Sequence, residues 1–346
     1  MRPTPLLIAA LALAAPLAGC APRRSALEVT QAAALSFSDS GQAREALGRR
    51  MRVLLLHDQF DRLDQIADSL RRSRERWPDD TWTLRRFYRD TFLGERSWDE
   101  EQWKELVKHV RVWRETRPRS ITAPVALATS LVGYAWSARG TGSADRVTRE
   151  GARLMRERLD EARMVLMAAR RLPQVCPYWW SAAQSVALGQ GWEREEYERT
   201  FEEAVARHPD FEGYYTAKAY FLLPCWYGKP GEWEVFATEI ASRLPDTLAA
   251  RVYAHIVWGQ SEFYGNIFDE TPASWERTKR GFRIMRAACP GSLEILSRFA
   301  YFACCALDRE TAHGLFEALG DRVDLAVWRD ARQFLQARAW ALAPPG

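Results

Sequence analysis

The sequence predicts an all-α protein built from consecutive helical hairpins, and three observations support this fold class. Apolar residues recur at steps of three and four along most of the chain, as at Trp103, Leu106 and Val110, which is the spacing of a helix packed on one side. No stretch shows sustained alternation of apolar and polar residues, so strands are not expected. Prolines interrupt the helical pattern every 32 to 59 residues, within or beyond the range of helical hairpin repeats.

These prolines mark the turns between hairpins. A proline cannot donate the helical hydrogen bond and disfavours helix in the residue before it. One hairpin alone leaves an apolar face in water, and stacking successive hairpins buries those faces in a continuous core. The turns are placed at Pro78, Pro118, Pro177, Pro209, Pro245 and Pro290.

The periodicity between the prolines predicts about seven helix pairs and a closing helix near 323–341 that caps the stack. The first helices of the pairs are expected near 41–57, 79–93, 121–138, 178–189, 211–224, 246–259 and 292–306. The second helices are expected near 59–76, 98–116, 146–171, 193–207, 231–243, 273–288 and 308–319.

The first twenty residues, MRPTPLLIAALALAAPLAGC, are typical of an export signal. One arginine precedes a short apolar run, which is too short to span a bilayer comfortably. The ending Leu17-Ala18-Gly19-Cys20 resembles a bacterial lipobox. The resemblance implies cleavage of residues 1–19, lipidation of Cys20, a tether over 20–40 and a helical-repeat domain over 41–346. The alternative is an ordinary signal peptide with a chance cysteine.

Composition narrows the class of function. The formal net charge is +4 and 47% of the residues are apolar, so the chain can bury a core and general disorder is not expected. The densest basic run, RRSRERW at 71–77, has helical spacing and fits a solvated face better than a nucleic-acid surface. We therefore expect no nucleic-acid partner.

No motif predicts catalysis, a metal site or a cofactor. The five histidines form no HExxH pattern and no CxxC occurs, so the usual zinc spacings are missing. The glycine-rich stretch GTGSAD at 140–145 has no expected strand before it and no lysine after it, unlike a phosphate-binding loop. Apart from Cys20, we expect the cysteines to be mainly buried thiols.

The loops between first and second helices are a candidate binding site, because a hairpin stack places them along one edge. They concentrate glycine, tryptophan and polar groups. The alternative interpretation is that each tryptophan folds back over the end of its hairpin. The candidate residues of this loop edge are Arg139, Gln190, Trp192, Trp226, Tyr227, Lys229, Trp233, Trp258 and Glu262.

A second candidate is a groove lined by the first helices. Gln184, Lys218 and Arg298 fall at similar depths in their helices, where charged groups would hold a carboxylate of a partner. The alternative for Lys218 is that its side chain runs past neighbouring aromatic rings to solvent.

Part of the chain resembles known repeats. YERTFEEAVARHPDF resembles the second helix of a tetratricopeptide repeat. The stretches LVGYAWSARGTGSAD, VALGQGW, AKAYFLLPCWYGKPGEW and RFAYFACCALDRETA resemble an uncharacterised bacterial family classed as a domain of unknown function. The resemblance covers roughly 50–330 and implies a tetratricopeptide-like α-solenoid, with no activity attached.

Two functions remain open at this point. The first is a non-enzymatic scaffold, anchored by lipid to the outer membrane of a bacterial cell envelope and facing the periplasm, that binds a protein or peptide partner. The alternative is a protein that binds peptidoglycan or another glycan, or an enzyme acting on one, through the tryptophan-rich loop edge. Glu262 and Asp269 would then be the carboxylates near the edge for acid–base work.

Overall fold

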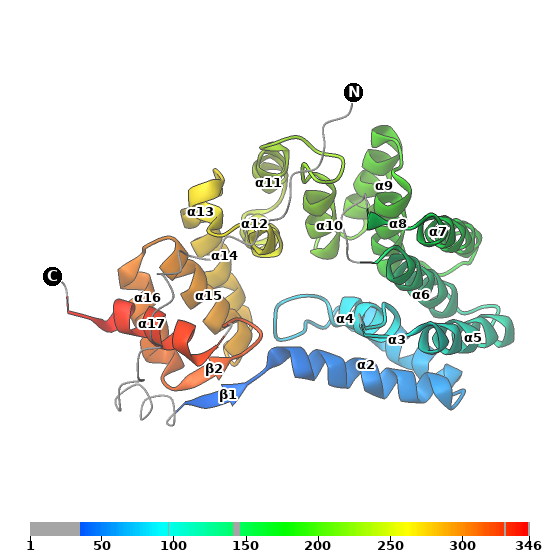
Figure 1. Cartoon of the computed structure of the whole chain (residues 1–346), viewed down its shortest axis with the longest axis horizontal. Helices are drawn as coiled ribbons and strands as arrows, with labels where there is room; N and C mark the ends of the chain where they lie inside the picture. The colour runs from blue at the N-terminus through cyan, green and yellow to red at the C-terminus, as the bar shows by residue number, and fades with distance from the viewer. Residues whose placement is uncertain (1–34, 96, 141–145, 329, 345–346) are drawn as a thin grey trace. The chain divides into compact units, whose positions relative to one another are not determined.

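The computed structural model describes residues 35–95, 97–140, 146–328 and 330–344, and 72% of the described residues are helical. The prediction of an all-α fold is confirmed (Figure 1). Each predicted helix is present close to its expected ends, apart from the closing helix. In chain order the helices are α2 (Ser40–Leu56), α3 (Phe60–Ser73), α4 (Thr83–Phe92), α5 (Glu100–Thr116), α6 (Thr122–Arg139), α7 (Arg149–Ala169), α8 (Tyr178–Gln190), α9 (Arg194–Arg207), α10 (Gly213–Phe221), α11 (Glu232–Arg243), α12 (Asp246–Gln260), α13 (Ile267–Glu270), α14 (Trp275–Ala288), α15 (Leu293–Cys305), α16 (Arg309–Leu319) and α17 (Ala331–Leu342).

The chain forms two compact units. The N-terminal unit is Gln42–Phe236, and the C-terminal unit contains the residues from Ala237 onward together with those up to Gly41. The sequence predicts one continuous series of hairpins over 41–346, whereas in the structure these residues form two units. The segment before α2 belongs to the C-terminal unit because strand β1 (Ser36–Ser38) pairs in parallel with β2 (Arg322–Asp324).

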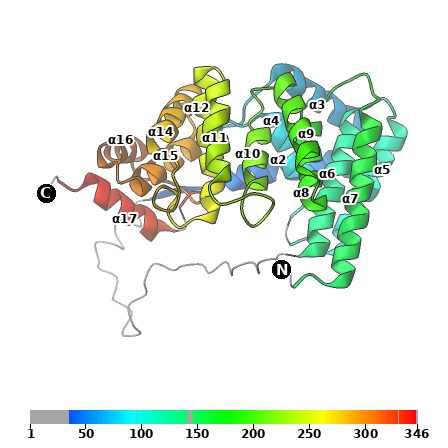
Figure 2. The same cartoon turned by 90° about the horizontal axis from the view of Figure 1, so that it is seen from above.

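Helix α6 is the central helix of the N-terminal unit. Every residue from Thr122 to Ala135 is buried, as expected for a helix that is apolar on all sides. The helices α3, α4, α5, α7 and α8 all contact it, and α5, α6 and α7 lie side by side (Figure 2). Gly133 permits one close approach, since a Cβ atom there would lie 2.4 Å from the carbonyl oxygen of Leu93.

The helices of the N-terminal unit begin and end where the sequence provides caps and breaks. Asp99 and Gln102 form a reciprocal capping box at the start of α5, which satisfies two otherwise unpaired backbone donors. Thr148 caps α7 through the backbone N–H of Gly151. Helix α9 ends at Arg207, two residues before Pro209. These local signals explain why the predicted boundaries lie close to the observed ones.

The C-terminal unit packs α12 against α14, α14 against α15, and α15 against α16 and α17. Its core is aromatic: the rings of Phe282 and Phe299 stack with centroids 5.4 Å apart, and Phe282 also contacts Phe302. The predicted closing helix over 323–341 is wrong at its start. Residues 322–324 form β2, and α17 begins at Ala331, where Asp330 accepts a hydrogen bond from Gln333.

In the part of the chain that the structure describes, we find no helix with both the length and the apolar character needed to cross a membrane. Cys20 and the predicted signal peptide lie outside the described residues.

Candidate functional site

The segment 76–82, between α3 and α4, forms a tight turn that carries two buried carboxylates. The backbone N–H of Trp77 donates to the carbonyl oxygen of Thr81 at 2.8 Å. Asp80 has φ 66°, a left-handed conformation that few residues other than glycine adopt. Asp79 and Asp80 are completely buried. Because water cannot solvate these charges, they need partners from the protein.

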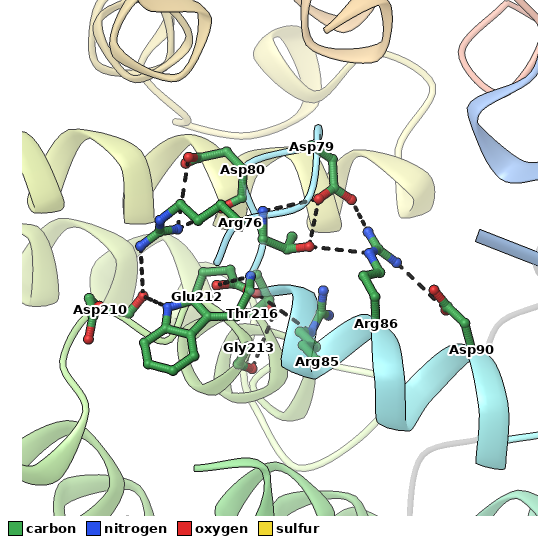
Figure 3. Close-up of polar contacts among 12 residues, drawn as sticks. Arg76, Asp79, Asp80, Arg85, Arg86, Asp90, Asp210, Glu212, Gly213 and Thr216 are labelled. Carbon is green, nitrogen blue, oxygen red and sulfur yellow. Dashed lines mark hydrogen bonds and ion pairs between the residues drawn. The ribbon is translucent and has the colours of Figure 1, made fainter. Parts of the chain in front are cut away.

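Asp79 is held from three sides (Figure 3). Its Oδ1 accepts hydrogen bonds from the backbone N–H and the hydroxyl of Thr81, at 3.0 and 2.6 Å. Its Oδ2 accepts from the Arg86 guanidinium and lies 3.9 Å from Nη1 of Arg44. Burial by itself raises the pKa of Asp79, but Arg86 and the Thr81 hydrogen bonds outweigh it and lower the pKa to about 2. Asp79 is therefore ionised at any physiological pH.

The same turn contacts the loop before α10, 130 residues further along the chain (Figure 3). The indole N–H of Trp82 donates to the carbonyl oxygen of Asp210 at 2.9 Å, and Nη2 of Arg76 donates to the same oxygen at 3.3 Å. The backbone N–H of Trp82 donates to Oε2 of Glu212 at 3.3 Å. The predicted turns at Pro78 and Pro209 are thus joined by polar contacts within the N-terminal unit.

Helix α4, which follows this segment, carries three arginines, Arg85, Arg86 and Arg89. Arg85 Nε lies 3.9 Å from Oε1 of Glu212. Arg89 is exposed and makes no ion pair or hydrogen bond with a described residue through its side chain. Desolvation by the surrounding protein lowers the pKa of Arg89, and the positive charges of Arg85 and Arg86 lower it further. Positive charge is therefore in excess beside Arg89.

Asp90 lies next to these arginines and is an incomplete partner for them. Burial raises its pKa, although the positive charges of Arg86 and Arg89 oppose that shift. Its Oδ1 is 3.9 Å from Nη1 of Arg86, and its Oδ2 is buried without a hydrogen-bond partner among the described residues. Asp90 therefore neutralises the arginines of α4 only in part.

Trp226, a predicted loop-edge residue, contacts Trp136 and Tyr220, which were not predicted. Together with Tyr227, the next residue of the predicted loop edge, these side chains form a second site that we call the aromatic rim. The rings of Trp136 and Trp226 meet edge to face with centroids 5.6 Å apart, and Tyr220 contacts Trp226 at 5.7 Å. Arg139 lies over the Trp136 ring at 5.6 Å. All four aromatic side chains are partly or largely exposed. The rim therefore presents aromatic surface from α6, α10 and the loop after α10.

Tyr227 is oriented by the backbone of another hairpin. Its hydroxyl donates to the carbonyl oxygen of Leu188 at 2.9 Å, and its ring stacks on Phe221 at 4.8 Å. The ring nevertheless remains 43% exposed. It is thus a fixed, accessible platform.

Other loop-edge residues do not reach an open surface. Trp192 is buried and donates to Oε1 of Gln190, whose amide donates to Asp160. Trp233 is also buried, so both tryptophans cover the ends of their hairpins, as in the alternative interpretation. Lys229 is exposed, and its backbone N–H donates to Glu232 at 2.8 Å.

The predicted groove needs correction. Gln184 is 1% exposed and its amide donates to the hydroxyl of Tyr197 and the carbonyl oxygen of Tyr214, both at 3.1 Å. Lys218 is 6% exposed, pairs with Glu198 and lies 4.1 Å from the centre of the Phe201 ring. Burial lowers the pKa of Lys218, while Glu198 raises it. Both side chains stabilise the interior and are not placed to clamp a partner.

Trp258, Glu262 and Arg298 come together in the C-terminal unit. The Arg298 guanidinium lies over the Trp258 ring at 5.0 Å, and His255 stacks on the same indole at 5.9 Å. Burial lowers the pKa of Arg298, and the charges of Glu294 and Glu262 raise it. Because Arg298 and His255 already occupy ring faces of Trp258, this indole is not an open stacking platform.

Two cavities lie in the N-terminal unit, and both are lined by charges that have local partners. A cavity of about 380 Å³ lies among α5, α6 and α7, where Arg111 pairs with Glu161. A smaller one of about 110 Å³ is lined by Trp179 and Trp180. There Arg170 covers Trp179 at 4.8 Å, and the indole N–H of Trp180 is buried without a hydrogen-bond partner among the described residues.

None of the described cysteines forms a disulfide. Cys176 is buried, Cys225 is exposed, and Cys289, Cys304 and Cys305 are partly buried. The expectation of mainly buried thiols is therefore wrong. Within the described residues, no group of three or more histidine, cysteine or acidic side chains is arranged to hold a metal ion.

Sequence reasoning missed the polar network around Asp79 and the arginines of α4. The stretch WPDDTW, which contains Pro78, predicts only a helix break. Two signals were present: adjacent carboxylates before an apolar helix, and arginines at positions 85 and 89, four residues apart, which share one helix face. Neither signal reveals Glu212 or Tyr178 as neighbours, because those residues arrive through tertiary packing.

Comparison of the chain with models of protein families, with curated proteins and with solved structures finds no match in any of the three. The resemblance to tetratricopeptide repeats and to a bacterial family of unknown function stays a prediction, and function must be argued from the sites themselves.

Proposed function

We propose that this chain is a lipid-anchored, tetratricopeptide-like scaffold of the bacterial cell envelope that binds a protein partner through the aromatic rim. The observation that carries the proposal is the clustering of Trp136, Tyr220, Trp226 and Tyr227 at the surface of the N-terminal unit, with Arg139 beside them. Tryptophan, tyrosine and arginine are the residues enriched at the energetic centres of protein interfaces.

The geometry of the rim favours recognition over catalysis. Its rings are fixed by one another, and Tyr227 is fixed further by its hydrogen bond to Leu188. Rigid aromatic side chains lose little conformational entropy on binding. The guanidinium of Arg139 lies over the rim, and because it stays protonated it suits binding better than proton transfer.

A glycan is the second candidate ligand, and the same exposed rings favour it. A sugar stacks on an indole or phenol face, and peptidoglycan would supply such sugars in the envelope. We favour a protein partner because Trp136 and Trp226 contact each other edge to face, which leaves a compact patch rather than a row of parallel platforms along a strand of sugars.

A photo-crosslinking amino acid placed at Tyr227 tests the rim in living cells. We expect one discrete cross-linked protein species, and we expect Trp226→Ala in the same chain to abolish it by removing the centre of the patch. The same amino acid at Met164, which is 66% exposed on α7, is the matched control and should give no such species.

Sedimentation with purified peptidoglycan separates the two candidates. If peptidoglycan pulls down the purified wild-type protein but not Trp226→Ala, the ligand of the aromatic rim is a glycan and not a protein. A cross-link that forms equally from Tyr227 and Met164, together with no sedimentation, would contradict both.

The anchor is part of the proposal and has its own test. The thiol of Cys20 is the group that would carry the lipid, and acyl chains hold a soluble body on a membrane by about 0.8 kcal/mol per buried methylene. We expect radiolabelled palmitate to be incorporated into the wild-type chain when it is expressed in a bacterial host. The Cys20→Ala variant should not be labelled. Because Ala21 follows Cys20 where an aspartate would favour inner-membrane retention, the labelled protein is expected in the outer membrane. A mature wild-type chain that keeps Met1 and carries no lipid would contradict the anchor.

A further inference from the structure

Three hydrogen-bond donors of the N-terminal unit meet without acceptors of their own. Arg85 and Arg89 lie four residues apart on α4, and Tyr178 is the first residue of α8. Among the described residues, the side chains of Arg89 and Tyr178 have no hydrogen-bond partner. Arg85 approaches Glu212 only to 3.9 Å, beyond hydrogen-bond distance. We call Arg85, Arg89 and Tyr178 the donor cluster.

Packing holds the donor cluster in place. The Tyr178 ring stacks on Tyr88 with centroids 4.7 Å apart and contacts Phe211 at 6.5 Å. Arg85 lies against Gly213, where a Cβ atom would be 3.1 Å from its Nε (Figure 3). Tyr178 is 94% buried, since only 6% of it is exposed. Its hydroxyl oxygen is not among the buried, unpartnered atoms of the described residues, so the O–H is accessible to a ligand although the ring is buried.

Tyr178 stacks on Tyr88, the residue that precedes Arg89, so its phenol lies beside the arginines of α4. The positive charge of Arg85 and the phenol of Tyr178 both act on the pKa of Arg89. Burial raises the pKa of Tyr178 to about 12, against the opposing charges of Arg89 and Arg85. Tyr178 is therefore protonated at neutral pH and able to donate its O–H.

The carboxylates around α4 pair with arginines other than Arg89. Arg86 is matched by Asp79, and Arg85 is opposite Glu212. Arg89 forms no ion pair with a described carboxylate. Asp90 lies 3.9 Å from Arg86, and its charge acts on Arg89 at longer range. A carboxylate brings one negative charge to Arg89, whereas a dianionic phosphate would bring two beside the carboxylates of Glu212 and Asp90.

From this arrangement we propose that Arg85, Arg89 and Tyr178 form a binding site for a carboxylate group. The Arg89 guanidinium pairs with the carboxylate, Arg85 supplies a second cationic donor from the same helix face, and Tyr178 donates its hydroxyl hydrogen. Charge-assisted hydrogen bonds of this kind are about twice as strong as neutral ones. The carboxylate comes from a free organic acid or from the end of a peptide chain, and both sources share this chemistry.

Calorimetric titration of the purified soluble chain with four probes tests the proposal at low ionic strength, where screening is weak. The probes are acetyl-glycyl-glycine, its C-terminal amide, propionate and inorganic phosphate. We expect acetyl-glycyl-glycine to bind and its amide not to bind. If propionate binds as tightly as acetyl-glycyl-glycine, the site is assigned to free organic acids. If the peptide binds more tightly than propionate, the site is assigned to the ends of peptide chains.

Variants of the donor cluster provide the controls. Arg89→Gln should weaken acetyl-glycyl-glycine at least about tenfold, and Tyr178→Phe, which keeps the stacking ring, about threefold. Arg89→Lys keeps the charge and should fall between Arg89→Gln and the wild type. Arg156→Gln removes an exposed arginine of α7 and should leave binding unchanged. Circular dichroism verifies that each variant is folded.

Three outcomes would overturn the carboxylate site. They are equal binding of the acid and the amide, unchanged binding by Arg89→Gln, and tighter binding of phosphate than of either carboxylate. Because the donor cluster shares no residue with the aromatic rim, failure here is separate from failure of the proposed partner binding.

Discussion

Replacing Asp79 by alanine is expected to lower the free energy of unfolding of the N-terminal unit by about 3–5 kcal/mol, the usual cost of removing one partner of a buried ion pair. The substitution leaves the Arg86 guanidinium, which is 12% exposed, without its nearest carboxylate. It also removes the acceptor of two Thr81 hydrogen bonds. At about 2–4 °C per kcal/mol, the thermal midpoint followed by circular dichroism should fall by about 6–20 °C.

Asp61→Ala is the matched control, because Asp61 also pairs with an arginine, at 2.6 Å from Arg117, but is 70% exposed. Exposed pairs contribute at most about 1 kcal/mol. Equal losses in Asp79→Ala and Asp61→Ala would show that burial of the Asp79 network adds nothing to stability.

The same network has a defined pH dependence. The pKa of Asp79 is lowered to about 2 from its ordinary value of 3.8, so its ionised form is favoured by folding. This contribution is fully present above pH 3.8 and is lost as the pH falls through about 2. The difference in stability between the wild type and Asp79→Ala should therefore be constant near neutral pH and shrink only in strong acid.

Replacing Gly281 by alanine is expected to destabilise the C-terminal unit by about 1–3 kcal/mol, the range for adding atoms to a packed interior. Helices α12 and α14 approach each other closely at this residue. A Cβ atom on Gly281 would lie 2.2 Å from the carbonyl oxygen of Ala250 and 2.5 Å from Cβ of Ala254. The backbone of α12 must move to admit it. Thermal unfolding measures the loss.

Gly314→Ala provides the comparison, since Gly314 is also inside a helix but has nothing within 4 Å of an added Cβ atom. Both substitutions gain the same helix propensity, about 1 kcal/mol. Gly314→Ala should therefore stabilise the protein. A gain in stability from Gly281→Ala would mean that the two helices are not in close contact in solution.

The candidate sites were predictable only where a local pattern carries them. The loop-edge prediction identified Trp226 and Tyr227 of the rim, because aromatic residues beside glycines in short connections are unusual. It included Trp192 and Trp233 as well, which the fold buries. Whether an end-of-helix tryptophan covers its own hairpin or meets a neighbour depends on which hairpins are adjacent, and that information is not local.

The donor cluster shows the same limit more sharply. Helical spacing places Arg85 and Arg89 on one face, but Tyr178 joins them from a helix that begins 89 residues after Arg89. Lys218 is a residue for which the sequence suggested a binding role and the structure shows burial. Its position suggested an exposed groove, yet Glu198 and the Phe201 ring hold it inside.

The order of short-range signals along the chain, namely apolar steps of three and four, capping residues and prolines, was enough to determine an all-helical chain and the positions of its paired helices. Hydrogen bonds and side-chain packing within one helix depend on residues three or four apart, so a single sequence contains them. Tertiary structure alone decided the pairing of β1 with β2, the contact between the Asp79 turn and Glu212, and the division into two units. These depend on contacts between residues more than a hundred positions apart, whose partners are selected by the packing of the whole chain.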